Sequence, residues 1–155
     1  MMVPSLDGPK NPTIDDVKHA AAEFNKMGQQ IAQAGIQLGL HNEGFEVSKV
    51  EEKRTYDVLF ELLDPQLVKF QFQCSEIKDG FVAADHFNRY PGRFISMHVQ
   101  DVKLGTKKEV AIGQGGIDWT KTFTAAKTGG IKNYFVEMDL PLMKASVPYL
   151  HQLNV

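Results

Sequence analysis

Side chains that can do chemistry gather at the ends of four apolar segments of the chain. Carboxylates and imidazoles that converge suit a divalent cation such as Mn²⁺, Mg²⁺ or Zn²⁺. Such an ion polarises a carbonyl and its neighbouring hydroxyl, while a remaining carboxylate moves a proton as a general base. The four sets are His41, Asn42 and Glu46; Gln73 and Glu76; His98 and Asp101; and Glu137 and Asp139.

Alternating strands and helices are needed to bring these four ends together. Thr13 is expected to cap a first helix, with Asp16 in the capping-box position, and residues 1–12 are expected to form a loop. Strands that start roughly thirty residues apart predict a parallel sheet with right-handed crossovers, whose C-terminal ends share one face. The predicted strands cover residues 36–40, 67–72, 94–99 and 131–136, and the helices that follow them cover about 56–63, 81–90, 118–127 and 142–153.

Simpler roles compete with the chemical ones. Asp101 and Asp139 can cap the helices that follow them, and a lone histidine such as His98 is often a hydrogen-bonded loop or core residue. The segment 113–116 lacks the Lys-Ser/Thr of a phosphate loop, so a flexible loop is expected there. Cys74 is expected to be a packed small side chain, because no base can be paired with it.

Composition favours a single globular domain over residues 1–155. The chain has 155 residues, is 43% hydrophobic and has a net charge of −2, with its basic residues scattered. These values give no support to a nucleic-acid partner. A single cysteine excludes an internal disulfide framework and fits a reducing compartment. Without an apolar stretch of about 20 residues, no membrane partner is expected, and a cytoplasmic protein is the default interpretation.

Seven short motifs follow one another between about Thr13 and Leu153. Together they resemble the second half of the sugar phosphate isomerase/epimerase family, the xylose isomerase-like TIM barrels that also include endonuclease IV. The motifs are Phe24-Asn25 with Gly28, His41-Asn42-x-x-Phe45-Glu46, Asp64-Pro65-x-Leu67-Val68, Tyr90-Pro91-Gly92-Arg93, His98-Val99-x-Asp101, Gly113-x-Gly115-x-Ile117-Asp118 and Phe135-Val136-Glu137-x-Asp139.

The resemblance implies an α/β fold, half of a (β/α)₈ barrel with four parallel strand–helix units preceded by one helix. It also implies a divalent metal held by Glu, Asp, His and Glu from successive strand ends. His98 and Glu137 match the last two ligands, and Glu46 is the preferred first one, with His41 close behind. The Asp position falls on Gln73, a neutral amide that binds a hard or borderline dication poorly.

Other site residues follow from the same resemblance. Glu43 stands where relatives often have a second histidine, and Gln100 where they often have lysine. Glu43 could restore the charge that Gln73 removes. The predicted site therefore has His41, Glu43 and Glu76 as catalytic residues, His98, Glu137, Glu46 and Gln73 as metal ligands, and Asn42, Asp101 and Lys103 as substrate-binding residues.

A half-barrel would leave two open sheet edges, which favour aggregation. Two copies could pair strand one with strand four across a twofold axis and close an eight-stranded barrel, or a partner half-barrel could do so. The expected function is metal-assisted proton transfer on a sugar or keto-sugar. The alternative is a non-catalytic truncated remnant, or a carbohydrate-binding module whose metal site has decayed. Nuclease activity is a third option, although endonuclease IV needs more His and carboxylate ligands.

Overall fold

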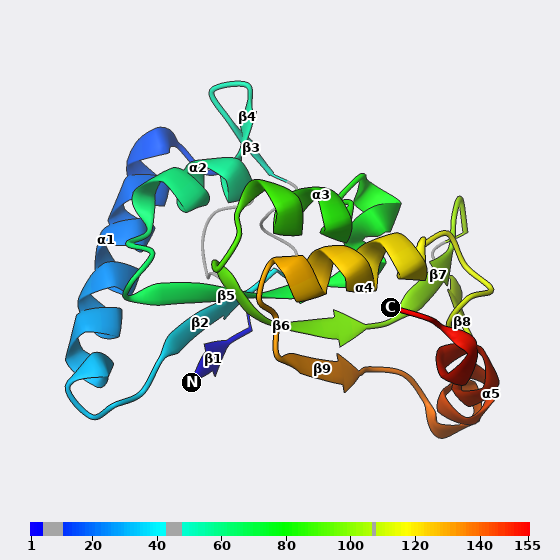
Figure 1. The fold of residues 1–155 in the computed structure, drawn as a ribbon. Helices are drawn as coiled ribbons and strands as arrows, with labels where there is room; N and C mark the ends of the chain where they lie inside the picture. The colour runs from blue at the N-terminus through cyan, green and yellow to red at the C-terminus, as the bar shows by residue number, and fades with distance from the viewer. Residues whose placement is uncertain (5–10, 43–47, 107) are drawn as a thin grey trace. The chain divides into compact units, whose positions relative to one another are not determined.

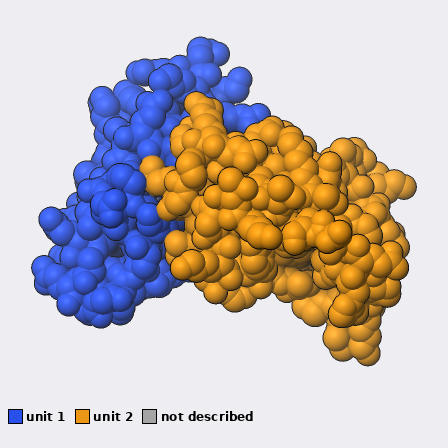
Figure 2. Space-filling model, viewed as in Figure 1, with its two compact units in different colours: residues 1–71 blue, residues 72–155 orange. Residues whose placement is uncertain are grey.

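The computed structural model describes residues 1–4, 11–42, 48–106 and 108–155. The chain divides into two compact units, Met1–Gln71 and Phe72–Val155, which Figure 2 colours blue and orange. The expectation of one domain over residues 1–155 stays a prediction.

The first unit is built around helix α1, Ile14–Ala32, which the capping signal predicted correctly. Thr13 Oγ1 accepts from the Asp16 backbone N–H at 3.2 Å, and Asp16 Oδ2 accepts from the Thr13 N–H at 2.8 Å. The Thr13 hydroxyl, which donates to Asp16 Oδ2 at 2.7 Å, and the Thr13 N–H lower the pKa of the Asp16 carboxyl. The apolar stripe that faces inward is buried at Val17, Ala21, Phe24 and Gly28.

Three parallel strands and helix α2, Thr55–Leu62, complete the first unit together with a short hairpin, β3 (Lys49–Val50) and β4 (Lys53–Arg54). Strand β2, Leu38–His41, pairs with β1, Met2–Val3, on one side and with β5, Val68–Gln73, on the other. Strand β1 corrects the expectation of a loop over residues 1–12, because two residues there add a parallel ladder. A two-residue strand is too short to show a periodic pattern.

The second unit contains the last two strands of the sheet and the helices that follow them. Phe72, Phe87 and Phe94 form a buried aromatic cluster with ring centroids 5.0–5.8 Å apart, and helices α3 and α4 pack on each other. Its elements are η1 (Cys74–Asp79), α3 (Ala83–Arg89), β6 (Phe94–Val99), β7 (Asp101–Lys103), β8 (Lys108–Val110), α4 (Trp119–Thr128), β9 (Asn133–Val136) and α5 (Leu140–Gln152).

The strands of the described chain follow the order β1-β2-β5-β6-β9 in one sheet, with β5 crossing the boundary between the units (Figure 1). Strands alternate with helices along the chain, which confirms the α/β class. The four predicted strand–helix units, preceded by helix α1, are confirmed, and the two-residue strand β1 is an additional strand at the edge of the sheet. The predicted closure of an eight-stranded barrel by a dimer stays a prediction.

Candidate functional site

Three strand ends in the second unit meet at the side chain of Glu137. The Oε2 atom of Glu137 accepts a hydrogen bond from Gln73 Nε2 and lies 3.0 Å from His98 Nδ1. Gln73 is the last residue of β5, His98 lies in β6, and Glu137 directly follows β9. The parallel register explains this meeting, because His98 pairs with Phe135 and the ladder continues to the Glu137 N–H, which donates to Val99 O at 3.4 Å.

Burial differs among the three side chains of this Gln73–His98–Glu137 cluster. Gln73 is buried, the His98 side chain is 19% exposed, and the Glu137 side chain is 50% exposed. The carboxylate therefore faces solvent, while the amide and the imidazole hold it from behind. Such an arrangement fixes a carboxylate in direction and leaves it open to a ligand.

Asp101 has a different environment, although it lies just after β6, the strand that contains His98. Its carboxylate is fully buried, and Oδ2 accepts from Trp119 Nε1 at 2.9 Å, from Gly113 N at 2.9 Å and from Gly115 N at 3.1 Å. Oδ1 accepts from Val102 N at 3.0 Å. Four N–H donors compensate the cost of burying the charge. Asp101 therefore organises the glycine-containing loop before α4.

Of the two aspartates that were expected to cap helices, Asp139 does so and Asp101 does not. Asp139 Oδ1 accepts from Leu142 N at 2.8 Å and caps α5, as expected. Asp101 caps no helix; it begins strand β7, and its bonds reach residues 12 to 18 positions further along the chain. Asp118 is the cap of α4 instead, through a 2.9 Å bond from Lys121 N.

The other predicted site residues have separate places. Glu76 is buried in η1 and forms an ion pair with Lys78 at 2.7 Å, and Lys103 is exposed on the β7–β8 hairpin. His41 and Asn42 are buried in the first unit. Glu43 and Glu46 lie outside the described residues. The structure thus brings together Gln73, His98 and Glu137.

Cys74 is a packed side chain, as expected. It is buried, and its Sγ lies 3.9 Å from Met97 Sδ. Burial, with a smaller contribution from the charge of Asp101, raises the pKa of the Cys74 thiol far above its usual value. A thiol that stays protonated is a poor nucleophile.

Two of the predicted metal ligands have donor atoms that suit a divalent cation. His98 and Glu137 offer an imidazole and a carboxylate, which suit Mn²⁺ or Zn²⁺, whereas Gln73 turns its amide N–H toward Glu137 and adds no charge. Among the residues that the structure describes, no group of three or more His, Cys, Asp or Glu side chains could hold a metal ion. The described residues thus offer two donors that suit a divalent cation, and the predicted first ligand, Glu46, lies outside the described residues.

No protein-family model matches the chain, and no curated protein matches it. Solved structures do. A sugar phosphate isomerase/epimerase from Parabacteroides distasonis is 24% identical, with a TM-score of 0.82 over 98% of this chain and 59% of that chain. A D-tagatose 3-epimerase-like protein is 14% identical, with a TM-score of 0.66 over 90% of this chain and 54% of that chain.

A third solved structure is also similar in fold at low sequence identity. A xylose isomerase domain protein from Alicyclobacillus acidocaldarius is 14% identical, with a TM-score of 0.65 over 98% of this chain and 62% of that chain. These identities show the fold alone, and the chain spans less than two thirds of each of these three structures. The predicted fold class is confirmed: the chain has the fold of a partial, xylose isomerase-like TIM barrel. No helix in the described part of the chain is long and apolar enough to cross a membrane.

Proposed function

We propose that this chain acts on a sugar or keto-sugar and takes a proton from the carbon next to the carbonyl, as an isomerase or epimerase does. The observation that carries the proposal is the half-exposed Glu137 carboxylate, held by His98 and Gln73 where three parallel strands end. In parallel α/β folds the carboxyl ends of the strands carry the active site. The likeness to structures named sugar phosphate isomerase/epimerase and D-tagatose 3-epimerase-like supports this reaction class.

The proposed cofactor is a divalent cation, Mn²⁺, Mg²⁺ or Zn²⁺, held by His98 and Glu137 together with Glu46. When bound, the cation would polarise the sugar carbonyl as a Lewis acid. The chain's own contribution is the fixed direction of the Glu137 carboxylate, because two hydrogen-bond donors meet one of its oxygens and leave its outer side to the ligand. Gln73 and His98 are thus positioned to hold this carboxylate in place.

Proton transfer needs a base beside the carbon that lies next to the carbonyl. The base takes the proton from this carbon. In isomerisation a proton returns to the former carbonyl carbon, and the proton of the neighbouring hydroxyl passes to the former carbonyl oxygen. In epimerisation a proton returns to the opposite face of the same carbon. Glu76, His41 and Glu43 are the proposed carriers. Of these, Glu76 belongs to the same unit as the cluster, where it forms an ion pair with Lys78.

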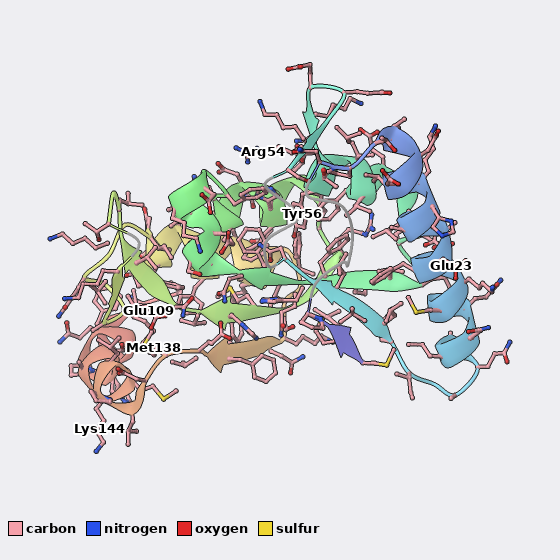
Figure 3. All side chains as sticks on the ribbon, turned by 180° about the vertical axis from the view of Figure 1, so that it is seen from behind. Glu23, Arg54, Tyr56, Glu109, Met138 and Lys144 are labelled. Carbon is pink, nitrogen blue, oxygen red and sulfur yellow. The ribbon has the colours of Figure 1, made fainter. Side chains whose placement is uncertain are left out.

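Solvent exchange tests the reaction without knowledge of the product. The protein is incubated in D₂O with tagatose, allulose and other ketoses and aldoses, and deuterium in the recovered sugar is measured by mass spectrometry. We expect incorporation at the carbon next to the carbonyl with at least one sugar, and a loss of at least about 100-fold in Glu137→Gln. Glu109→Gln, the same change on exposed strand β8 (Glu109 is labelled in Figure 3), should keep the rate. Equal rates in the two variants would contradict the proposal.

A non-catalytic carbohydrate-binding module is the second candidate, and one observation favours it. Gln73 stands where the family that the chain resembles has an anionic metal ligand. Here its neutral amide donates a hydrogen bond to Glu137, so the carboxylate has a partner without a cation. Native mass spectrometry after incubation with Mn²⁺, Mg²⁺ and Zn²⁺ separates the candidates. One cation per chain, lost in His98→Ala and kept in the matched surface variant His19→Ala, supports the enzyme; no retained cation favours the binding module.

A further inference from the structure

Helix α5 is held to the rest of the second unit by a buried hydroxyl. Of its thirteen residues, all of which the structure describes, Ser146 is the buried one, with 1% of its surface exposed. Helices usually pack through an apolar stripe, whereas here a polar side chain is the part that is fully covered. A buried hydroxyl needs hydrogen-bond partners, so its contacts show what it holds.

The Ser146 hydroxyl joins three segments of the chain. Its Oγ atom accepts from the Ile112 N–H at 2.9 Å, donates to Leu142 O at 2.7 Å and lies 3.6 Å from Met138 Sδ. A bond from a serine to the carbonyl four residues earlier is common in helices. The bond from Ile112 is different, because it comes from loop 111–116, 34 residues away in the sequence, and from a residue that is itself buried.

Tyr149 adds a second contact on the same loop. It lies three residues after Ser146 and on the same side of the helix, and a Cβ atom on Gly113 would lie 2.5 Å from Tyr149 Cδ2. The ring therefore packs on bare glycine backbone, which has a φ of +89° there. Contacts at Ile112 and Gly113 together fix both the position and the rotation of α5 on the loop.

The contacts of Ser146 close a ring around the candidate site. One side of the ring follows the chain from His98 to Asp101, whose carboxylate accepts from N–H groups of the loop. The other side runs from Ser146 back to Glu137 across Met138, labelled in Figure 3, where β9 passes into α5. The two sides meet at the loop, and they meet again where Glu137 Oε2 lies 3.0 Å from His98 Nδ1. A closed ring restrains these two side chains from both ends, which an open strand end does not.

We propose that Ser146 is a positioning residue, which keeps the Glu137 carboxylate against His98 and Gln73. The proposal rests on the proposed function, in which this carboxylate must keep its direction toward the ligand. The Glu137 side chain is half exposed, and the bond from its backbone N–H to Val99 O is long, at 3.4 Å. Ser146 supplies a second restraint on this segment, from the side of α5.

Ser146→Ala tests the proposal through the rate of deuterium exchange. It leaves the buried Ile112 N–H without its acceptor, so the loop and α5 should separate. A displacement of about 1 Å near a reacting group can cost about 100-fold in rate, and we expect kcat to fall at least about tenfold. KM should change by less than about threefold, because every group of the site is still present. The matched control is Thr128→Ala, which removes a hydroxyl that bonds to Thr124 O within α4 and should keep the rate.

The side-chain amide signal of Gln73 in NMR spectra tests the positioning without a substrate, because this amide donates to Glu137. We expect the signal to shift or broaden in Ser146→Ala and to stay in place in Thr128→Ala. A serine with a merely structural role would change the free energy of unfolding, yet its loss would leave this signal and kcat unchanged.

Circular dichroism checks that Ser146→Ala is folded. If it is not, Tyr149→Ala replaces it with the same expected results, because it loosens the same docking from a half-buried position. An unmoved amide signal or an unchanged kcat in the folded variant would overturn the proposal. If the natural chain exchanges deuterium with no sugar, the proposed function fails instead, and the amide signal alone decides whether Ser146 positions Glu137.

Discussion

Asp101 and Glu137 are two carboxylates that follow neighbouring strands of the same unit, yet their surroundings differ. Asp101 is fully buried and accepts from four N–H groups. Glu137 is half exposed and has one amide and one imidazole beside a single oxygen. A carboxylate whose oxygens are all used by the protein holds the fold together, whereas one with an open side can meet a ligand. Position at a strand end does not distinguish the two.

The largest expected effect comes from Asp101→Asn. The side-chain amide of asparagine places an NH₂ group where a carboxylate oxygen now accepts from N–H donors. Buried N–H groups therefore lose their hydrogen-bond acceptor. We expect a loss of about 3 kcal/mol in the free energy of unfolding, measured by urea denaturation. Asp118→Asn is the matched control and should cost almost nothing, because asparagine is an equally good N-cap. Similar losses in both variants would show that Asp101 has no special structural role.

The second largest effect is expected in the loop whose Gly113 and Gly115 N–H groups donate to Asp101. A Cβ atom on Gly115 would lie 1.9 Å from Asp101 Oδ1, so Gly115→Ala must displace the carboxylate or the loop. We expect a loss of about 2 kcal/mol in thermal or urea unfolding. Gly129→Ala, whose added Cβ would meet its nearest atom at 3.2 Å, should cost less. The reverse order would mean that the loop does not depend on close contact with Asp101.

Gln73→Asp tests whether the surroundings of Glu137, unlike those of Asp101, can bind a cation. It places an anionic oxygen where the neutral amide now donates to Glu137. We expect Mn²⁺ to bind about tenfold more tightly, or about 1.4 kcal/mol, by isothermal titration calorimetry. Gln114→Asp adds the same charge on an exposed loop and should leave the affinity unchanged. An unchanged affinity in Gln73→Asp would argue against a cation at this cluster.

The smallest expected effect on stability is that of Glu137→Gln. Half-exposed ion pairs contribute little, so the free energy of unfolding should fall by less than about 1 kcal/mol. This small cost contrasts with the large loss of exchange activity expected for the same variant. A loss as large as that of Asp101→Asn would make Glu137 a second structural carboxylate.

The sequence predicted the fold well where side-chain patterns repeat and poorly where they do not. The α1 stripe and the Thr13–Asp16 cap were correct because burial and capping leave regular signals. Strand β6 was predicted at its exact bounds, 94–99. The two-residue strand β1 and the hairpin of β7 and β8 were missed, since segments of two or three residues carry no detectable period.

The candidate site was predicted in part. The strand-end rule and the family resemblance selected Gln73, His98 and Glu137, which do meet. Neither could show that Asp101 is fully enclosed, because its donors come from residues 113, 115 and 119, across a loop. The available signal was the pair Gly113 and Gly115 followed by the only tryptophan, Trp119. Glycines that let backbone N–H groups approach one carboxylate could have indicated this bond network.

One measurement compares the two carboxylates directly: an NMR titration with paramagnetic Mn²⁺. The Trp119 indole N–H reports on Asp101, and the Gln73 side-chain amide reports on Glu137. If Glu137 is the carboxylate that meets ligands, the Gln73 amide signal broadens at lower Mn²⁺ than the single indole signal does. Earlier loss of the indole signal, or no selective broadening of either, would contradict the assignment of Glu137 to chemistry and Asp101 to structure.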